Sequence, residues 1–299
     1  MPARLPTIPV RLGLLRHAYS TASPSTLKIT SVPAPHAGSI KIISLNRPSA
    51  RNAISRQLLS DLRAEIETLH SESFNGPTRA LILASESKDC FCAGADLKER
   101  LGFSADDTKN FLKTLRDTFT RISTLPIPTI SAVASSAFGG GLELALCTSF
   151  RVFGSSAVVA LPETRLAIIP GAGGTFRLPA LIGTARARDM ILTGRRVAGP
   201  EAYFLGLCDR LVGELPGEDK EGAAKKDPQE LVLGQAVQMA RDICEGGPVA
   251  IRAALDAVNG WGAGEELENM MYESVMPTED RVEALKAFGE KRKPVFKGR

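Results

Sequence analysis

The stretch SSAFGGGLELALCTSFRVFGSSAVVALPETRLAIIPGAGGT covers residues 135–175 and gathers the most unusual features of the chain. Glycines cluster at 139–141 and again at 171–174. Glycine lets a backbone adopt conformations closed to other residues and come close to a ligand. Glu143 and Glu163 lie in apolar runs between the clusters, where a buried carboxylate is costly without a partner or a chemical role. The stretch therefore predicts a binding or catalytic site.

Strands and helices alternate through the first two thirds of the chain. Strands are indicated where apolar residues alternate or run together between turn residues, and helices where they recur every three or four positions. Such alternation predicts an α/β fold whose strands are at least partly parallel. The predicted strands are 39–45, 79–84, 128–134, 150–153 and 157–161, and the predicted helices are 53–69, 106–125, 175–192 and 199–205.

The pattern changes towards the C-terminus. Residues 214–229 are polar and rich in charge, which predicts an exposed loop. Helical segments follow without a strand between them, so the simplest interpretation is a helical extension on an α/β core. Helices that lack a closed core of their own commonly dock on another subunit, and we therefore expect a homo-oligomer. The predicted helices are 230–245, 248–259, 265–276 and 279–291.

The N-terminal segment is basic. Its first 28 residues include Arg4, Arg11, Arg16 and Lys28 and no acid. Arginine and small polar residues without acids are typical of a mitochondrial transit peptide, although a disordered basic tail has a similar composition. These four charges equal the net charge of +4 of the whole chain, so residues 29–299 sum to zero. The body of the protein is therefore not a polycation.

Residue types disfavour several classes of site. The spacing of Cys90 and Cys92 is wrong for zinc, and no histidine lies nearby, so no metal is expected. All three histidines precede residue 71, far in sequence from the glycine clusters, which disfavours a hydrolase with a histidine base. A run of eighteen apolar residues, as a transmembrane helix needs, is absent. Acid–base chemistry would more naturally fall to carboxylates.

Two loops could hold an anion. The cluster at 139–141 would place N–H groups at the start of a helix beginning near Leu142. It lacks the spacing of a dinucleotide fingerprint and the Gly-Lys-Ser/Thr of a P-loop, and close helix packing is an alternative reason for the glycines. The loop AGAD at 93–96 is a second candidate, in which Asp96 could equally cap a helix.

Four motifs taken together resemble the crotonase family of enoyl-CoA hydratases and isomerases. The resemblance extends from about residue 28 to the C-terminus. It implies an α/β, crotonase-like spiral of ββα units with a C-terminal helical oligomerisation region. The expected division is a transit peptide or disordered segment at 1–27, the core at 28–229 and the helical region at 230–299. The motifs are SLNRPSARNA at 44–53, FCAGADLKER at 91–100, SAFGGGLELAL at 136–146 and LPETRLAIIPGAGGTFRLP at 161–179.

The resemblance implies catalytic roles. The backbone N–H groups of Ala95 and Gly140 would form an oxyanion hole for a thioester carbonyl, where preorganised donors stabilise developing charge. Glu163 would exchange the proton at the α-carbon, and Glu143 would hold and activate the water added at the β-carbon. Family isomerases commonly retain a single acid at these positions, so the pair favours a hydratase. No cofactor is implied, because coenzyme A is part of the substrate.

The resemblance also implies substrate contacts. Arg47 or Arg51 would reach a phosphate of coenzyme A, with solvated surface as the alternative for both. Gly171 would begin a helix beside the acyl pocket. A distal carboxylate on the acyl group would need a cation, for which Arg100 and Arg165 are candidates by position. The residues expected along the acyl-CoA channel are Ala93, Ala95, Asp96, Leu97 and Lys98.

LKER at 97–100, LPETRLAIIPG at 161–171 and the tail from Met276 resemble the mitochondrial methylglutaconyl-CoA hydratases most. We therefore expect hydration of 3-methylglutaconyl-CoA to 3-hydroxy-3-methylglutaryl-CoA, in leucine degradation in the mitochondrial matrix, by a trimer or hexamer without a membrane partner. A short-chain enoyl-CoA hydratase of fatty-acid β-oxidation is the close alternative.

An AU-rich RNA-binding protein is the alternative of another class, since some members of that group are described as binding such RNA. The helix at 53–69 mixes Arg56 and Arg63 with acids, and the chain without its N-terminal segment is neutral. Because RNA binding relies on clustered positive charge, RNA is an unlikely partner.

Overall fold

The computed structural model describes residues 25–72, 76–213 and 227–299. The predicted N-terminal segment and most of the predicted loop at 214–229 lie outside these ranges. The main sheet has the strand order β1-β2-β3-β5-β7-β10, in which β1 is antiparallel to β2 and the other neighbours are parallel. Its strands are β1 Leu27–Pro33, β2 Ser39–Leu45, β3 Thr78–Ser85, β5 Thr129–Val133, β7 Phe150–Gly154 and β10 Arg210–Val212.

A smaller sheet continues the spiral, with the order β4-β6-β8-β9. Each of its strands has at most three residues, too few for an alternating pattern, which is why only β8 coincides with a predicted strand. Strand β1 was also absent from the prediction, because it lies at the sheet edge and most of its side chains are exposed. The strands of the smaller sheet are β4 Cys90–Cys92, β6 Ser136–Phe138, β8 Val158–Ala160 and β9 Val197–Ala198.

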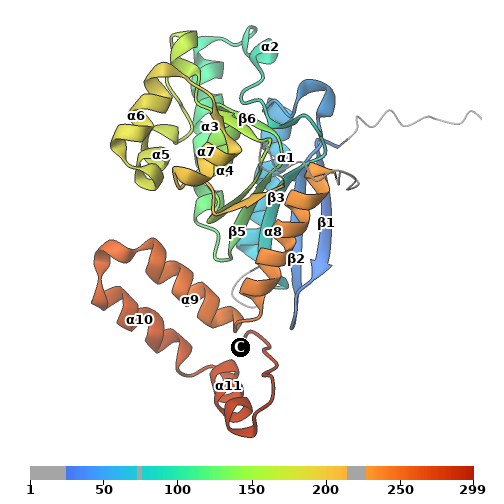
Figure 1. Cartoon of the computed structure of the whole chain (residues 1–299), viewed down its shortest axis with the longest axis vertical. Coiled ribbons are helices and arrows are strands. Elements are labelled where there is room, and N and C mark those ends of the chain that lie inside the picture. Colours follow the sequence, from blue (N-terminus) through green and yellow to red (C-terminus); the bar gives the residue numbers. More distant parts are fainter. Residues whose placement is uncertain (1–24, 73–75, 214–226) are drawn as a thin grey trace, which may run out of the picture.

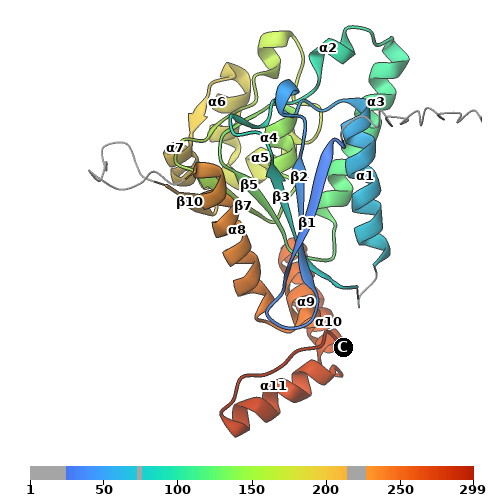
Figure 2. The same ribbon diagram turned by 90° about the vertical axis from the view of Figure 1, so that its right-hand side faces the viewer.

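Two helices cover one face of the main sheet, α1 (Arg56–Ser71) and α3 (Ala105–Ser123) (Figure 2). The side chain of Ser55 accepts a hydrogen bond from the Leu58 amide and fixes the start of α1. Ser104 and Asp107 form a capping box that starts α3. The apolar stripes of both helices pack on every second residue of the strands. Together they form the larger of two hydrophobic clusters, one on each face of the sheet.

Helix α8 (Pro228–Cys244) covers the opposite face (Figure 2). Its apolar side chains, including Val232 and Met239, pack against Ile40 and Ile42 of β2, whereas Ile43 of the same strand points into the larger cluster. The alternation of β2 therefore divides two cores, one on each side of the sheet. Although the sequence grouped this helix with the C-terminal helices, it packs as part of the α/β body.

The remaining helices differ little from their predicted bounds. The exception is the predicted helix at 175–192, which is two helices because Gly183 lies at φ 82° and ends the first. Helices α9, α10 and α11 project beyond one end of the sheet (Figure 1) and expose large apolar side chains such as Tyr272 and Phe288. The bounds are α5 Gly174–Ile182, α6 Thr184–Thr193, α7 Gly199–Phe204, α9 Pro248–Asn259, α10 Glu265–Val275 and α11 Glu279–Glu290.

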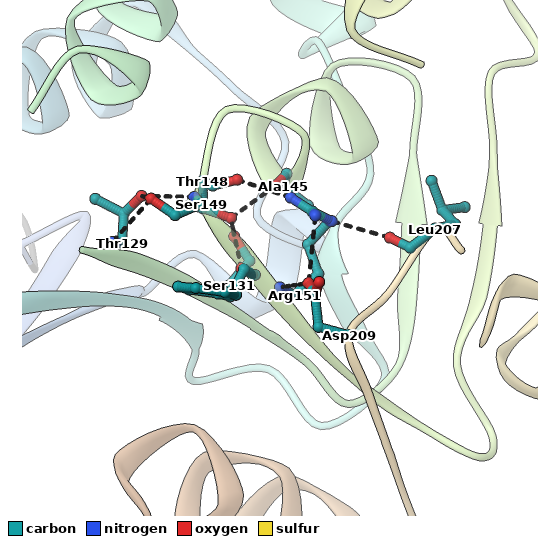
Figure 3. A network of polar contacts seen from close by, with 9 residues as sticks. Thr129, Ser131, Ala145, Thr148, Ser149, Arg151, Leu207 and Asp209 are labelled. Atoms are coloured by element: carbon teal, nitrogen blue, oxygen red, sulfur yellow. Dashed lines mark hydrogen bonds and ion pairs between the residues drawn. The ribbon is translucent and has the colours of Figure 1, made fainter. Parts of the chain in front are cut away.

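A buried arginine joins β7 to the segment that follows helix α4 (Gly140–Ala145) (Figure 3). Arg151 is 4% exposed, donates from Nε to the Leu207 carbonyl at 2.9 Å and from Nη1 to the Thr148 carbonyl at 2.7 Å. Its Nη2 lies 3.2 Å from a carboxylate oxygen of Asp209. Thr148 in turn donates from its hydroxyl to the Ala145 carbonyl at 2.8 Å. The network therefore holds the C-terminal end of α4 against the sheet.

Replacing Arg151 with Met is expected to lower the free energy of unfolding by about 3 kcal/mol, because buried carbonyls and the Asp209 carboxylate lose their donor. Urea unfolding followed by circular dichroism measures the change. Arg210→Met, at an exposed position of β10, is the matched control and should change stability by less than about 0.5 kcal/mol. Equal unfolding midpoints for the two variants would contradict the assigned role of the network.

Candidate active site

Glu143 joins the two glycine clusters. It lies in α4, which begins at Gly140 rather than near Leu142 as predicted, and its side chain is buried at 2% exposure. Its Oε1 accepts hydrogen bonds from the backbone N–H groups of Ala172 and Gly174, both at 2.8 Å. The second cluster therefore supplies the partners that a buried carboxylate requires, and it fixes the orientation of Glu143.

Glu163 begins a 3-10 helix (Glu163–Leu166) that follows strand β8, and it is 8% exposed. Among the described residues, its Oε2 has no hydrogen-bond partner. A Cβ atom added to Gly139 would lie 2.9 Å from its Oε1, and Gly139 has φ 52°, so both space and backbone conformation require glycine there. An unpartnered, buried carboxylate oxygen beside a glycine turn is a group available for a ligand.

The two carboxyl groups differ in their electrostatic surroundings. Burial, with a smaller contribution from the nearby Glu143 carboxylate, raises the pKa of Glu163 to about 7. Burial also raises the pKa of Glu143, but the two backbone N–H donors and the cations Arg177 and Arg116 oppose that effect. The proton of a singly protonated pair therefore resides on Glu163, and Glu143 carries the negative charge.

Two backbone N–H groups lie together beside this pair. A Cβ atom added to Gly140 would lie 3.7 Å from the Ala95 nitrogen, so the loop after β4 and the start of α4 are in contact. Ile54 holds that loop, accepting from Asp96 N at 3.1 Å and donating to the Gly94 carbonyl at 2.7 Å. Within the described residues, neither Ala95 N nor Gly140 N donates to a protein acceptor. Both donors are available to an oxygen atom of a ligand.

These groups line one cavity of about 470 Å³. Its walls are largely apolar and include the side chains of Leu112 and Ile169. The predicted residues that the structure brings to this cavity are Ala93, Ala95, Leu97, Arg100, Gly140, Glu143, Glu163 and Gly171.

Four predicted substrate contacts do not line the cavity. Arg47 is paired with Asp96 through both terminal nitrogens, each 3.1 Å from Asp96 Oδ2. Asp96 also accepts from Glu99 N at 3.3 Å, which confirms the alternative that it caps a helix, α2 (Leu97–Arg100). Arg51 and Lys98 are exposed outside the cavity. Their contacts with coenzyme A stay a prediction.

Arg165, one of two cations predicted to meet a distal carboxylate, points elsewhere. Its Nε and Nη2 donate to the Thr193 carbonyl at 3.0 and 2.8 Å, away from the cavity lining. Arg116 lines the cavity instead. It lies on the polar side of the predicted helix at 106–125, where an arginine looks like ordinary surface, so no signal in the sequence singled it out.

Residues 25–72, 76–213 and 227–299 contain no group of three or more His, Cys, Asp or Glu side chains that could hold a metal ion. In the same ranges, no helix has the length and apolar character to cross a membrane. The cysteines are buried, and burial raises the pKa of the Cys92 and Cys147 thiols to about 12, so both stay protonated.

An α/β spiral that brings a carboxylate pair and two available amide donors to one apolar cavity is the architecture of a hydro-lyase. The particular family follows from comparison with known proteins. A family model described as enoyl-CoA hydratase/isomerase matches residues 36–299, and the chain belongs to this family, which is also called the crotonase family.

Relatives cover nearly the whole chain. An enoyl-CoA isomerase/hydratase of Zymoseptoria tritici is 65% identical over 94% of this chain and 91% of its own. A protein of Pyricularia oryzae named methylglutaconyl-CoA hydratase 1, mitochondrial, is 55% identical over 96% of this chain and 91% of its own. The crystal structure of an enoyl-CoA hydratase from Bacillus anthracis, 38% identical, superposes with a TM-score of 0.80 over 91% of this chain and 99% of that one. The predicted crotonase-like fold is confirmed.

Proposed function

We propose that this protein is an enoyl-CoA hydratase that acts on a short branched substrate, 3-methylglutaconyl-CoA, and forms 3-hydroxy-3-methylglutaryl-CoA. The observation that carries the proposal is the convergence of Glu143, Glu163 and the amides of Ala95 and Gly140 on one cavity. The similarity to a protein named methylglutaconyl-CoA hydratase supports the choice of substrate.

The amide pair would bind the thioester carbonyl oxygen. Addition of water at the β-carbon moves negative charge onto that oxygen, and each preorganised donor can stabilise it by about 3 kcal/mol. Because Ala95 N and Gly140 N donate to no acceptor among the described residues, no internal hydrogen bond has to break when the substrate arrives.

The carboxyl pair would handle the protons. Glu143, as the carboxylate, takes a proton from water while the water oxygen bonds to the β-carbon. Glu163, as the acid, gives its proton to the α-carbon, to which the electrons of the double bond move. The product gains one water molecule, and one proton has passed from Glu163 to Glu143 and must return before the next turnover.

A hydration assay over a small panel of enoyl-CoA thioesters tests the proposal. We expect kcat/KM for 3-methylglutaconyl-CoA to exceed that for crotonyl-CoA. A strong preference for crotonyl-CoA would favour the short-chain alternative of β-oxidation. Turnover of none of the panel would overturn the proposal.

Replacing Glu143 with Gln is expected to lower kcat about 100-fold, because an amide still orients water but cannot accept its proton. Steady-state hydration of 3-methylglutaconyl-CoA measures the loss. Glu268→Gln, at an exposed position of α10, is the control and should retain wild-type kcat. A Glu143→Gln variant with undiminished kcat would remove Glu143 from the mechanism.

RNA binding finds no support on helix α1. Arg63 pairs with Glu67 at 2.8 Å, and Arg56 pairs with Asp107 at 2.7 Å, so acids neutralise the basic side chains of that face. Salt-dependent binding of an AU-rich oligonucleotide by the protein lacking residues 1–27 would reverse this assignment.

We also propose import into the mitochondrial matrix and assembly into a trimer or hexamer. The basic, acid-free N-terminal segment and the mitochondrial name of the Pyricularia oryzae relative support the first. The exposed apolar side chains of α9–α11 support the second. Fluorescence microscopy of a fusion to residues 1–27 tests the first, and a cytosolic signal would contradict it. Light scattering of the protein lacking residues 1–27 tests the second, and the mass of a monomer would contradict it.

A further inference from the structure

Two arginines lie in the wall of the otherwise apolar cavity. Arg100 and Arg116 line it together with Glu143 and Glu163. A guanidinium stays protonated at any working pH, and a purely apolar acyl chain gains nothing from meeting one. A cation at this place therefore points to an acyl group that carries negative charge of its own.

Arg116 is held close to the catalytic pair by a single peptide unit. Its Nε donates to the Gly171 carbonyl at 2.7 Å, and the N–H of the same peptide, on Ala172, donates to Glu143 Oε1 at 2.8 Å. The width of one peptide unit added to these two bonds places Arg116 Nε at most about 8 Å from Glu143 Oε1. The cation is therefore anchored in the cavity wall within about 8 Å of the carboxylate assigned to the water.

The terminal nitrogens of Arg116 can still donate hydrogen bonds to a ligand. In the described ranges, only its Nε makes a hydrogen bond, and the side chain has no acidic partner. By contrast, Arg165 donates to the Thr193 carbonyl, and Arg177 donates to the Ala172 carbonyl and stacks 4.7 Å from the centre of the Phe176 ring. A guanidinium anchored through Nε presents its outer edge for bidentate contact with a carboxylate.

We propose that Arg116 binds a carboxylate at the distal end of the acyl group and gives the enzyme its preference for monothioesters of dicarboxylic acids. A carboxyl carbon attached through one methylene lies roughly 2.5 Å beyond the β-carbon, within reach of a side chain fixed beside Glu143. A second negative charge entering a cavity in which Glu143 already carries one is stabilised by a nearby cation. This inference rests on the proposed hydratase activity.

The test compares glutaconyl-CoA with crotonyl-CoA, which differ by a carboxylate on the γ-carbon. For Arg116→Met, we expect kcat/KM for glutaconyl-CoA to fall about 30-fold more than that for crotonyl-CoA, mainly through KM, because a charge-assisted contact with one substrate is lost. A general effect of the missing charge on Glu143 acts on both substrates and cancels in the ratio. Arg116→Lys should restore part of the preference.

Arg165→Met is the matched control, because it removes an arginine that lies outside the cavity lining. It should change the ratio by less than about threefold. Equal losses on the two substrates in Arg116→Met, or no wild-type preference for glutaconyl-CoA, would overturn the inference while hydratase activity stands. Absence of hydration of both thioesters and of 3-methylglutaconyl-CoA by the wild type would instead refute the proposed function.

Discussion

Replacing Glu163 with Gln is expected to lower kcat for hydration about 1000-fold, because the variant has no acidic proton to give to the α-carbon. The carboxyl group is suited to that task, since burial raises its pKa to about 7 and its Oε2 has no competing partner in the described structure. Single-turnover hydration of 3-methylglutaconyl-CoA measures the loss without interference from product release. Retention of more than about a tenth of wild-type kcat would exclude Glu163 as the acid.

The same carboxyl group sets the pH dependence. The active free enzyme has one proton on the pair, so kcat/KM for hydration should fall as pH rises through about 7. Because the reaction involves no net proton, kcat/KM for dehydration must fall over the same range. The residual kcat/KM of Glu163→Gln should not fall as pH rises through this range. A flat wild-type profile between pH 6 and 9 would contradict the assignment.

Stability provides an independent readout of the raised pKa of Glu163. The protonated form is favoured in the folded state, so its contribution to stability is complete below the unfolded pKa of 4.5 and is lost as pH rises through about 7. Glu163→Gln, which cannot ionise, should therefore be more stable than the wild type by about 3 kcal/mol at pH 8 and equally stable at pH 4. A Glu163→Gln variant that gains stability and loses activity would show that this carboxyl group is buried for function rather than for stability.

Replacing Gly141 with Ala is expected to lower kcat/KM on the order of 1000-fold, because it separates the two halves of the oxyanion hole. A Cβ atom at this position would lie 2.1 Å from the Cys92 carbonyl oxygen, which belongs to strand β4. The start of α4 and the loop after β4 must then move apart, and Gly140 N and Ala95 N move with them. We also expect a loss of about 3 kcal/mol in the free energy of unfolding, typical of overpacking against backbone.

A glycine with open space is the matched control for that variant. A Cβ atom added to Gly234 of helix α8 meets nothing within 4 Å, so Gly234→Ala should retain activity and gain about 0.5–1 kcal/mol of stability. Activity is measured without urea, and the two variants are compared only after circular dichroism has shown that both are folded. If folded Gly141→Ala kept wild-type kcat/KM, contact between the two loops would not be needed for catalysis.

Long elements of the fold could be predicted because their side chains repeat with the period of the structure. Strand β2 and helices α1, α3 and α9 were predicted within a few residues, since alternation and three-to-four spacing reflect a buried face directly. The short strands β4 and β6 could not be predicted in this way. They are stabilised by pairing with neighbours far along the chain, as Cys90 pairs with Ser136, and pairing of that kind leaves no local pattern.

For the site, the sequence by itself determined which residue types were available: two acids among glycines, a second loop with AGAD, and no histidine close by in the chain. Only the tertiary structure decided how they are used. It gave Glu143 the amides of the second glycine cluster, left Glu163 Oε2 without a partner, and paired Arg47 with Asp96. It also brought Arg116 to the cavity and left Arg165 outside it. The physical reason is that burial and hydrogen-bond partners depend on packing between distant segments, whereas sequence patterns report only which face of an element is apolar.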